Sequence, residues 1–183
     1  MENVKKKKIG FFEKLYELFK PMYIYKSVEA IPFLLLEKEN IKLVMLDMDN
    51  TLIDKELNYT RDLVEWIDRL KRENIKIYIL SNSLNTKVVK SISKKLGIKY
   101  HNKAIKPLKG GFKYILEKEK VKPQNTLMIG DQLFTDVFGG NRVGVKTVLV
   151  NIKDKNERLH TKLKRPLERK LLNYITKKES DKK

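Results

Sequence analysis

The chain has 183 residues, which is enough to bury the core of one domain of ordinary size but short for two. It contains no cysteine, so disulfides, thiolate nucleophiles and zinc–thiolate centres are excluded, and a reducing cytoplasm is the expected setting. Lys and Arg number 41 against 23 Asp and Glu, and the net charge of +18 predicts attraction to a polyanion, either nucleic acid or an anionic membrane surface.

Between the two ends of the chain, short apolar runs typical of buried strands alternate with segments of helical periodicity. Thr60 is placed to cap the first of these helices and Gly97 to end the second. The alternation predicts an α/β domain over residues 39–152, with three layers and a Rossmann-like parallel sheet joined by crossover helices. The predicted strands are 41–48, 75–80, 98–104, 126–129 and 145–150, and the predicted helices are 61–73, 87–96, 109–120 and 135–141.

The two flanking segments, 1–38 and 153–183, are basic and amphipathic. In the first, Lys5–Lys8 precede aromatic and aliphatic residues at helical spacing, and in the second leucines recur among many basic side chains. Such helices either lie in a membrane interface or pack on the core, and the pattern fits both. With the net charge, we expect a cytoplasmic protein attached peripherally to the inner face of a membrane. The longest uncharged apolar stretch, 31–36, is too short to span a bilayer.

Four short polar motifs follow four of the predicted strands. The first is Asp47-Met48-Asp49-Asn50-Thr51, followed along the chain by Ser81-Asn82-Ser83, Lys106-Pro107 and the segment Gly130 to Asp136. Because parallel strands have their carboxyl ends at one edge of a sheet, we expect the motifs to line one pocket there. Paired carboxylates in such a pocket indicate magnesium and phosphate. The alternative roles are helix caps for the Ser-Asn pair, a surface cation for the lysine and a helix-start acid for the last aspartate.

In order and placement these motifs resemble those of the haloacid dehalogenase superfamily of phosphatases, over roughly residues 41–150. The nearest type is the capless subfamily IIIA group labelled YqeG-like, which is related to phosphatidylglycerophosphate phosphatases. The resemblance implies that Asp47 is the nucleophile, forming an aspartyl-phosphate, and that Asp49 acts as general acid and then as general base. It also implies that Lys106 pairs with Asp47 and with the transferring phosphoryl group.

The same resemblance assigns the remaining site residues. Thr51, Ser81 and Asn82 would bind the phosphoryl oxygens. Magnesium would be held by Asp47, by the backbone carbonyl of Asp49 and by Asp131. Asp136 would orient Asp131 or a metal-bound water.

The implied function is magnesium-dependent conversion of phosphatidylglycerophosphate to phosphatidylglycerol at the membrane surface. The segments that follow the first and second motifs are filled by one helix and one strand each, so no cap domain is expected and the site should be open to a bulky lipid phosphate. Two alternatives are a phosphatase of a soluble phosphoester and a phosphatase-like protein that binds RNA or the ribosome. The sequence carries no indication of the oligomeric state.

Overall fold

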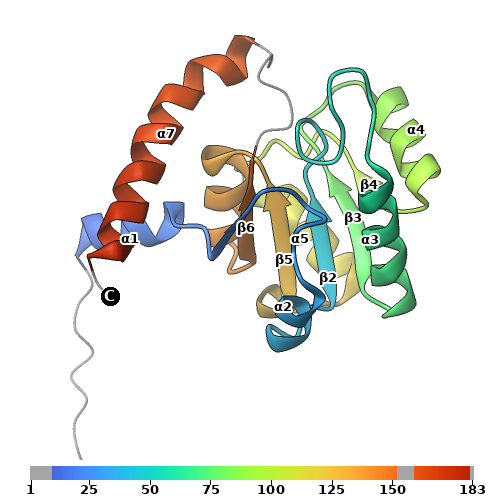
Figure 1. Cartoon of the computed structure of the whole chain (residues 1–183), viewed down its shortest axis with the longest axis horizontal. Coiled ribbons are helices and arrows are strands. Elements are labelled where there is room, and N and C mark those ends of the chain that lie inside the picture. Colours follow the sequence, from blue (N-terminus) through green and yellow to red (C-terminus); the bar gives the residue numbers. More distant parts are fainter. Residues whose placement is uncertain (1–9, 152–158, 182–183) are drawn as a thin grey trace, which may run out of the picture.

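The computed structural model describes residues 10–151 and 159–181, without the side chains of residues 11, 12 and 159–165. Its strands form one six-stranded sheet, and helices pack around that sheet (Figure 1). The strands are β1 (Tyr23–Tyr25), β2 (Leu43–Leu46), β3 (Lys76–Leu80), β4 (Lys99–His101), β5 (Thr126–Gly130) and β6 (Lys146–Val150). The helices are α1 (Phe11–Phe19), α2 (Phe33–Lys38), α3 (Arg61–Arg72), α4 (Thr86–Leu96), α5 (Lys109–Glu119), α6 (Phe138–Asn141) and α7 (Leu159–Ser180), with a 3-10 turn η1 (Pro123–Asn125) and a π-helical turn η2 (Leu133–Val137).

The sheet has the order β1-β6-β5-β2-β3-β4, and every neighbouring pair is parallel. From β2 the chain first builds outward through β3 and β4, and it then returns to the other side of β2 to add β5 and β6. The direction of winding therefore reverses between β2 and β5, and a crevice opens at the carboxyl ends of these two strands. The predicted α/β fold with a parallel sheet and crossover helices is confirmed.

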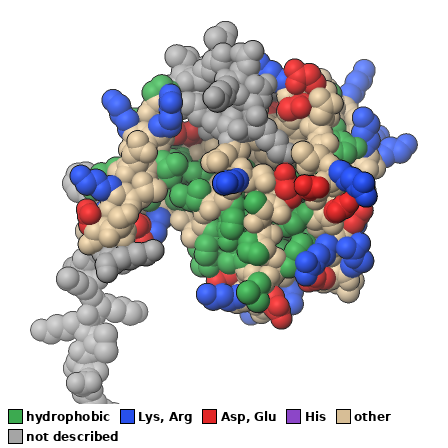
Figure 2. All heavy atoms as spheres, viewed as in Figure 1, with side chains coloured by type: hydrophobic (Ala, Val, Ile, Leu, Met, Phe, Trp, Pro, Cys, Tyr) green, Lys and Arg blue, Asp and Glu red, His purple; other side chains and the backbone are tan. Residues whose placement is uncertain are grey.

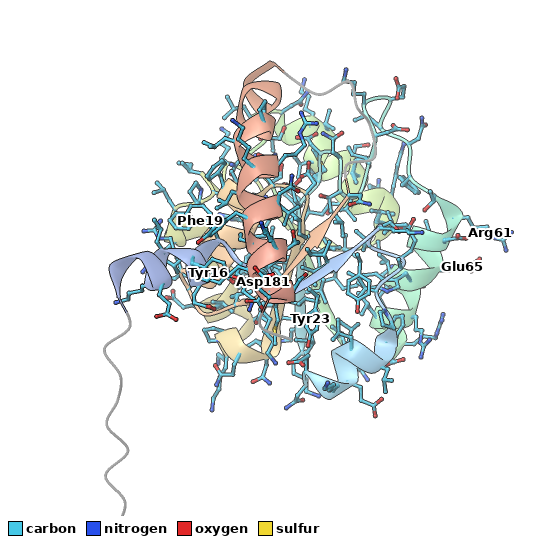
Figure 3. The ribbon with its side chains drawn as sticks, turned by 60° about the vertical axis from the view of Figure 1, so that its left-hand side comes forward. Tyr16, Phe19, Tyr23, Arg61, Glu65 and Asp181 are labelled. Atoms are coloured by element: carbon cyan, nitrogen blue, oxygen red, sulfur yellow. The ribbon has the colours of Figure 1, made fainter. Side chains whose placement is uncertain are left out.

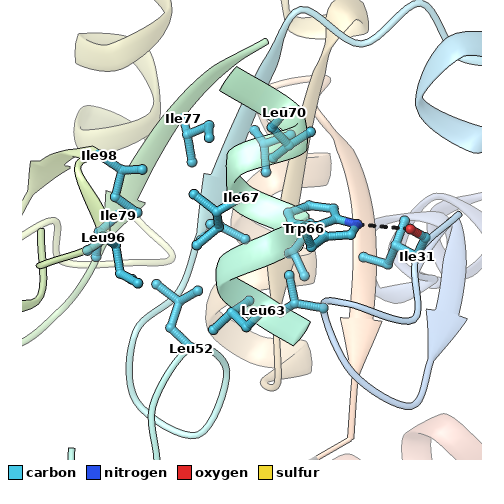
Figure 4. Packing of buried hydrophobic residues seen from close by; sticks show 14 of the residues in the cluster. Ile31, Leu52, Leu63, Trp66, Ile67, Leu70, Ile77, Ile79, Leu96 and Ile98 are labelled. Atoms are coloured by element: carbon cyan, nitrogen blue, oxygen red, sulfur yellow. Dashed lines mark hydrogen bonds between the residues drawn. The ribbon is translucent and has the colours of Figure 1, made fainter. Parts of the chain in front are cut away.

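Alternate residues of the strands feed two apolar clusters on opposite faces of the sheet. Val44 and Leu46 of β2 belong to the larger cluster, which takes in side chains of α2, α3 and α4, whereas Leu43 and Met45 face α5. Figure 4 shows the larger cluster, in which the indole N–H of Trp66 donates to the backbone carbonyl of Ile31 at 3.0 Å. This bond ties α3 to the segment that precedes α2.

The helix ends follow the predicted capping residues. The side chain of Thr60 accepts the backbone N–H of Leu63 at 3.2 Å, which caps the start of α3. Gly97 ends α4 with a φ of 61°, a left-handed conformation that glycine adopts without a steric penalty. Both predicted caps are confirmed.

The region that precedes β2 is more closely built into the fold than the predicted segment 1–38 implies. Tyr23–Tyr25 form β1, which pairs with β6, and Val28, Ile31 and Leu36 are almost completely buried in the larger cluster. The short strand was not predicted because three residues carry too little periodicity, and its pairing depends on a strand more than a hundred residues later. The core therefore begins well before residue 39.

Helices α1 and α7 pack on each other and on the η2–α6 segment. The hydroxyl of Tyr16 donates to Glu179 Oε1 at 2.8 Å, and Lys20 forms an ion pair with the other carboxylate oxygen of Glu179 at 2.6 Å. Figure 3 shows Tyr16 beside the end of α7 that carries Asp181. Tyr16 and Ile175 are 6% and 2% exposed, so part of each amphipathic face is buried against protein.

Some of the predicted amphipathic pattern lies outside the described residues, namely Lys5–Lys8 and the side chains of Phe11, Phe12, Leu159 and Leu163. Within the described part of the chain, no helix combines the length and apolar character needed to cross a membrane. On the face drawn in Figure 2, Lys and Arg side chains are spread along the left-hand helices, the lower edge and the right-hand side, with Asp and Glu between them. The positive charge on that face is therefore dispersed.

Candidate active site

The first and fourth motifs meet at the crevice defined by the strand order. Asp47 directly follows β2 and Asp131 directly follows β5, and these strands are neighbours in the sheet. The second and third motifs follow β3 and β4 at the same edge. The sheet thus brings together the four motifs that the sequence placed in one pocket.

Lys106 is a buried cation held between two buried carboxylates. Its Nζ donates to Asp47 Oδ1 at 2.5 Å and to Asp136 Oδ1 at 2.7 Å, and none of the three side chains is more than 8% exposed. Burial alone would lower the pKa of the Lys106 ammonium, but the carboxylates of Asp136 and Asp47 raise it above its usual range. The lysine is therefore a fixed positive charge, and the alternative of a surface cation is wrong.

Asp136 connects this lysine to the loop that starts at Asp131. Its Oδ1 binds Lys106, and its Oδ2 accepts the backbone N–H of Gln132 at 3.1 Å. Gly130 makes the arrangement sterically feasible, because a Cβ atom at that position would lie 2.6 Å from the Cβ of Asp136 and still closer to its carboxyl group. Asp136 thus does more than begin a helix, while its expected role at Asp131 or at a metal-bound water stays a prediction.

The carboxylates fit a divalent cation. One oxygen from each of Asp47, Asp131 and Asp136 lies within 4.8 Å of the others. Asp47 Oδ2 is buried and has no hydrogen-bond partner among the described residues. Burial raises the pKa of the Asp47 carboxyl, although Lys106 opposes this shift, and a bound cation would favour its ionised form. Since both oxygens of Asp136 are already engaged, Asp47 and Asp131 are the best candidates for metal ligands.

The loop after β3 supports Lys106 through its backbone. Asn82 Oδ1 accepts the backbone N–H of Lys106 at 2.7 Å, and Asn82 Nδ2 donates to the Lys106 carbonyl at 3.0 Å. The hydroxyl oxygen of Ser81 accepts the N–H of Ser83 at 3.0 Å. Asn85 caps α4, so the alternative in which Ser81 or Asn82 is the cap is wrong. Asn82 holds the backbone of Lys106, and its expected role in binding phosphate stays a prediction.

The loop after β2 places the remaining predicted residues. Thr51 is fully buried, and its hydroxyl donates to Asp131 Oδ1 at 3.4 Å, so the side chain faces the candidate metal ligand. Asn50 adopts a φ of 63°, a left-handed conformation that asparagine tolerates better than most residues. This turn lets the backbone bend back while Asp49 still lines the pocket.

A cleft of about 1100 Å³ opens over these groups. Its floor is charged, because Asp47, Asp49 and Lys106 line it, whereas one side is aromatic. The aromatic and several polar lining residues were not predicted as site residues. Some of them nevertheless lie inside the motifs, namely Asn50, Ser83, Pro107, Gln132, Phe134 and Thr135. Phe19 carries no local signal at all, since only the packing of α1 brings it to the cleft. The unpredicted lining residues are Phe19, Asn50, Asp54, Lys55, Leu57, Ser83, Leu84, Asn85, Pro107, Gln132, Phe134, Thr135 and Phe138.

The fold and this buried Asp–Lys–Asp arrangement fit a phosphoric monoester hydrolase, and this is the class to which the relatives of the chain belong. Residues 11–154 match the family described as "Mitochondrial PGP phosphatase", and the chain belongs to that family. Over 165 residues it is 36% identical to the Bacillus subtilis (strain 168) protein named "Probable phosphatase YqeG". The alignment covers 90% of this chain and 95% of that protein. The resemblance found in the motifs is thereby confirmed at the level of the family.

Two solved structures share the fold. An uncharacterized protein from Listeria monocytogenes serotype 4b aligns with a TM-score of 0.52 and 21% identity, over 65% of this chain and 86% of that chain. The 3-deoxy-D-manno-octulosonate 8-phosphate phosphatase from Yersinia pestis aligns with a TM-score of 0.51 and 17% identity, over 64% and 69% of the two chains. At these identities the two structures support the fold alone.

Proposed function

We propose that the protein is a magnesium-dependent phosphatase that converts phosphatidylglycerophosphate to phosphatidylglycerol through an aspartyl-phosphate. The observation that carries the chemistry is the buried Asp47 carboxylate, with one oxygen on Lys106 and the other without a partner among the described residues. A positive charge and a metal on one carboxylate are what an anionic nucleophile needs to approach an anionic phosphate.

In the proposed mechanism, an oxygen of Asp47 attacks phosphorus while the ester oxygen leaves, and Asp49 gives that oxygen a proton. Water then attacks the phosphorus of the aspartyl-phosphate and passes a proton to Asp49, and the bond between phosphorus and Asp47 breaks to release inorganic phosphate. Lys106 neutralises charge on Asp47 and on the phosphoryl oxygens. The cation, held by Asp47, Asp131 and the carbonyl of Asp49, supplies further positive charge when it is bound.

The lipid substrate is supported by the family to which the chain belongs and by the net charge of +18, which favours an anionic membrane surface. The site is also open, because the connections from β2 to α3 and from β3 to α4 are the short segments 47–60 and 81–85, with no room for a cap domain. A lipid phosphate at a bilayer can reach such a site. We propose peripheral attachment to the inner face of a membrane on the same grounds.

A phosphatase of a soluble phosphoester is the second candidate. The observation that favours it is the burial of Tyr16 and Ile175, because apolar positions of α1 and α7 that could enter a membrane are used for packing instead. RNA binding stays a prediction that rests only on the net charge of the chain.

The test is magnesium-dependent phosphate release from phosphatidylglycerophosphate in mixed micelles, beside glycerol 3-phosphate and nucleoside monophosphates. Asp47→Asn should lose turnover, and the matched control is Asp68→Asn, which changes an exposed carboxylate of α3 that is paired with Lys71. Calorimetric titration of magnesium should detect binding to the wild type and much weaker binding to Asp131→Asn. Turnover of soluble esters alone would favour the second candidate, and full activity of Asp47→Asn would contradict the mechanism.

A further inference from the structure

Three aromatic side chains from two distant parts of the chain form one wall of the catalytic cleft. The ring of Phe19 stacks on that of Phe138, with centroids 4.5 Å apart and an interplanar angle of 8°. It meets the ring of Phe134 edge to face at 5.4 Å. All three side chains are half-buried and line the same cleft as Asp47 and Lys106. We refer to Phe19, Phe134 and Phe138 as the aromatic wall.

The wall is fixed from behind by polar contacts. Asn141 Nδ2 donates to three backbone carbonyls at the end of α1, including that of Lys20 at 2.9 Å, and so anchors the helix that carries Phe19. The buried carboxylate of Glu168 on α7 accepts the backbone N–H of Phe134 at 3.1 Å. The guanidinium of Arg142 lies 5.3 Å from the centroid of the Phe138 ring. The wall is therefore preorganised rather than a loose surface.

The aromatic wall lies where the leaving group of a bound phosphate ester would extend. Pro107 directly follows Lys106 and lines the cleft, and Phe134 lies two residues before Asp136, so the wall begins beside the charged floor. Leu57 and Leu84 line the same cleft and are 40% and 80% exposed. Leu84 follows β3, which lies on the other side of β2 from β5 and the loop that carries Phe134. A phosphate held at the floor thus has an apolar route toward solvent, and neither leucine side chain is needed to fill the core.

We propose that the aromatic wall, with Leu84 at the opposite lip, is a subsite for the apolar part of the leaving alcohol, as in a lipid phosphate. This inference rests on the proposed function and deepens it, because it names the residues that would select apolar esters over small polar ones. Ligand sites commonly combine a few polar groups with an apolar lining, and here the two halves face different parts of one ester. Helix α1 would supply through Phe19 the wall that an inserted domain could otherwise provide.

The size of the expected effect follows from hydrophobic transfer. Each buried methylene contributes about 0.8 kcal/mol, which corresponds to a factor of about four in kcat/KM. Ethyl, butyl and hexyl phosphate have leaving alcohols of similar acidity, so chemistry alone predicts similar rates for the three. Because the cleft is open and buries a chain only in part, we expect kcat/KM to rise roughly tenfold or more from ethyl to hexyl phosphate. All three esters can be used below micelle-forming concentrations, so attachment to a membrane plays no role.

The variants come in matched pairs. Phe19→Ala should flatten the dependence of kcat/KM on chain length. Phe33→Ala removes a half-buried ring on α2 that lies tilted beside Trp66, with centroids 5.8 Å apart, and should retain the dependence. Leu84→Ser and Leu34→Ser alter leucines that are 80% and 73% exposed, so neither should unfold the protein. Only Leu84→Ser, at the cleft, should weaken turnover of hexyl phosphate.

Binding provides a readout that is independent of turnover. Hexylphosphonate and ethylphosphonate cannot be hydrolysed at the carbon–phosphorus bond, and calorimetry of the magnesium-loaded wild type should show tighter binding of the hexyl compound. Equal binding of the two, together with equal kcat/KM across the esters, would overturn the subsite while leaving the phosphatase function intact. An equal loss in Phe19→Ala and Phe33→Ala would also overturn it. Tighter hexylphosphonate binding without turnover of any ester would instead contradict the proposed function and retain the subsite.

Discussion

Replacement of Gly130 by alanine tests how Lys106 is held. The new Cβ would lie 2.6 Å from the Cβ of Asp136, whereas real Cβ atoms essentially never come within 3.0 Å of another heavy atom. To regain carbon–carbon contact at about 3.5 Å, the Asp136 side chain must retreat by about 1 Å. That shift would stretch its bonds to Lys106 and to the amide of Gln132, which are 2.7 and 3.1 Å long.

The expected loss in the free energy of unfolding combines two effects. Overpacking a buried site costs about 1–3 kcal/mol, and weakening one arm of a buried ion-pair network adds part of the 3–5 kcal/mol seen when such a pair is broken. Because Asp47 still pairs with Lys106, we expect the free energy of unfolding to fall by about 3 kcal/mol, which lowers Tm by about 6–12 °C for a chain of this size. Displacing Lys106 by up to about 1 Å should reduce kcat by up to about 10²-fold.

Thermal unfolding and phosphatase assays measure both effects. Gly110→Ala is the matched control, because Gly110 lies in α5 and a Cβ there meets no atom within 4 Å. That change should leave activity alone and raise stability by about 0.5 kcal/mol through helix propensity. If Gly130→Ala had the stability and activity of the wild type, Asp136 would not depend on the missing Cβ and the reasoning would be refuted.

Three further predictions concern stability. Hydrogen bonding from Lys99, against an opposing effect of burial, holds the pKa of Glu119 at about 2, so its stabilising effect is present above pH 4.5 and is lost as the pH falls toward 2. Glu119→Gln should lower the free energy of unfolding by about 1–2 kcal/mol at pH 7, after allowance for solvent screening of the exposed lysine, and by less at pH 3. Urea titrations at the two pH values measure both losses, and equal losses would contradict this prediction. Asn141→Ala should accelerate amide exchange in α1, and unchanged exchange would show that the helix is anchored otherwise. Trp66→Phe leaves the buried carbonyl of Ile31 unpaired and should cost about 1–3 kcal/mol by circular dichroism, whereas wild-type stability would mean that the bond contributes little.

The sequence could predict that the four motifs meet at one edge of the sheet, because each motif directly follows a strand and all the strands are parallel. Asp47 and Asp131 end strands whose apolar runs are unmistakable, and parallel strands place their carboxyl ends together whatever the rest of the chain does. The caps at Thr60 and Gly97 are equally local, since each depends on backbone geometry within one turn of a helix. Local signals of this kind can be interpreted without knowledge of the tertiary structure.

The bonding partners of the site residues could not be predicted in the same way. The expected role of Asn82 at the phosphate stays a prediction, but the bonds of its amide to the backbone of Lys106 and the bond of Asp136 to the ammonium of the same lysine carry no signal in the sequence. A side chain of a given type forms the bonds that its neighbours in space offer, and those neighbours are set by β3, β4 and β5 together. Phe19 is the extreme case, because only the docking of α1 brings it to the cleft.

The terminal helices show why helical periodicity cannot by itself separate a membrane-bound helix from a packed one. An apolar stripe satisfies either environment, and the decision depends on what covers it. In the described part of the chain, α7 covers Leu133 and Val137 of η2 with Leu171 and Leu172, while its Glu168 holds the backbone of Phe134. The segment that carries Asp136 is therefore packed between the sheet and α7. A helix that appears to be an appendage in the sequence thus supports the turn whose Asp136 binds Lys106.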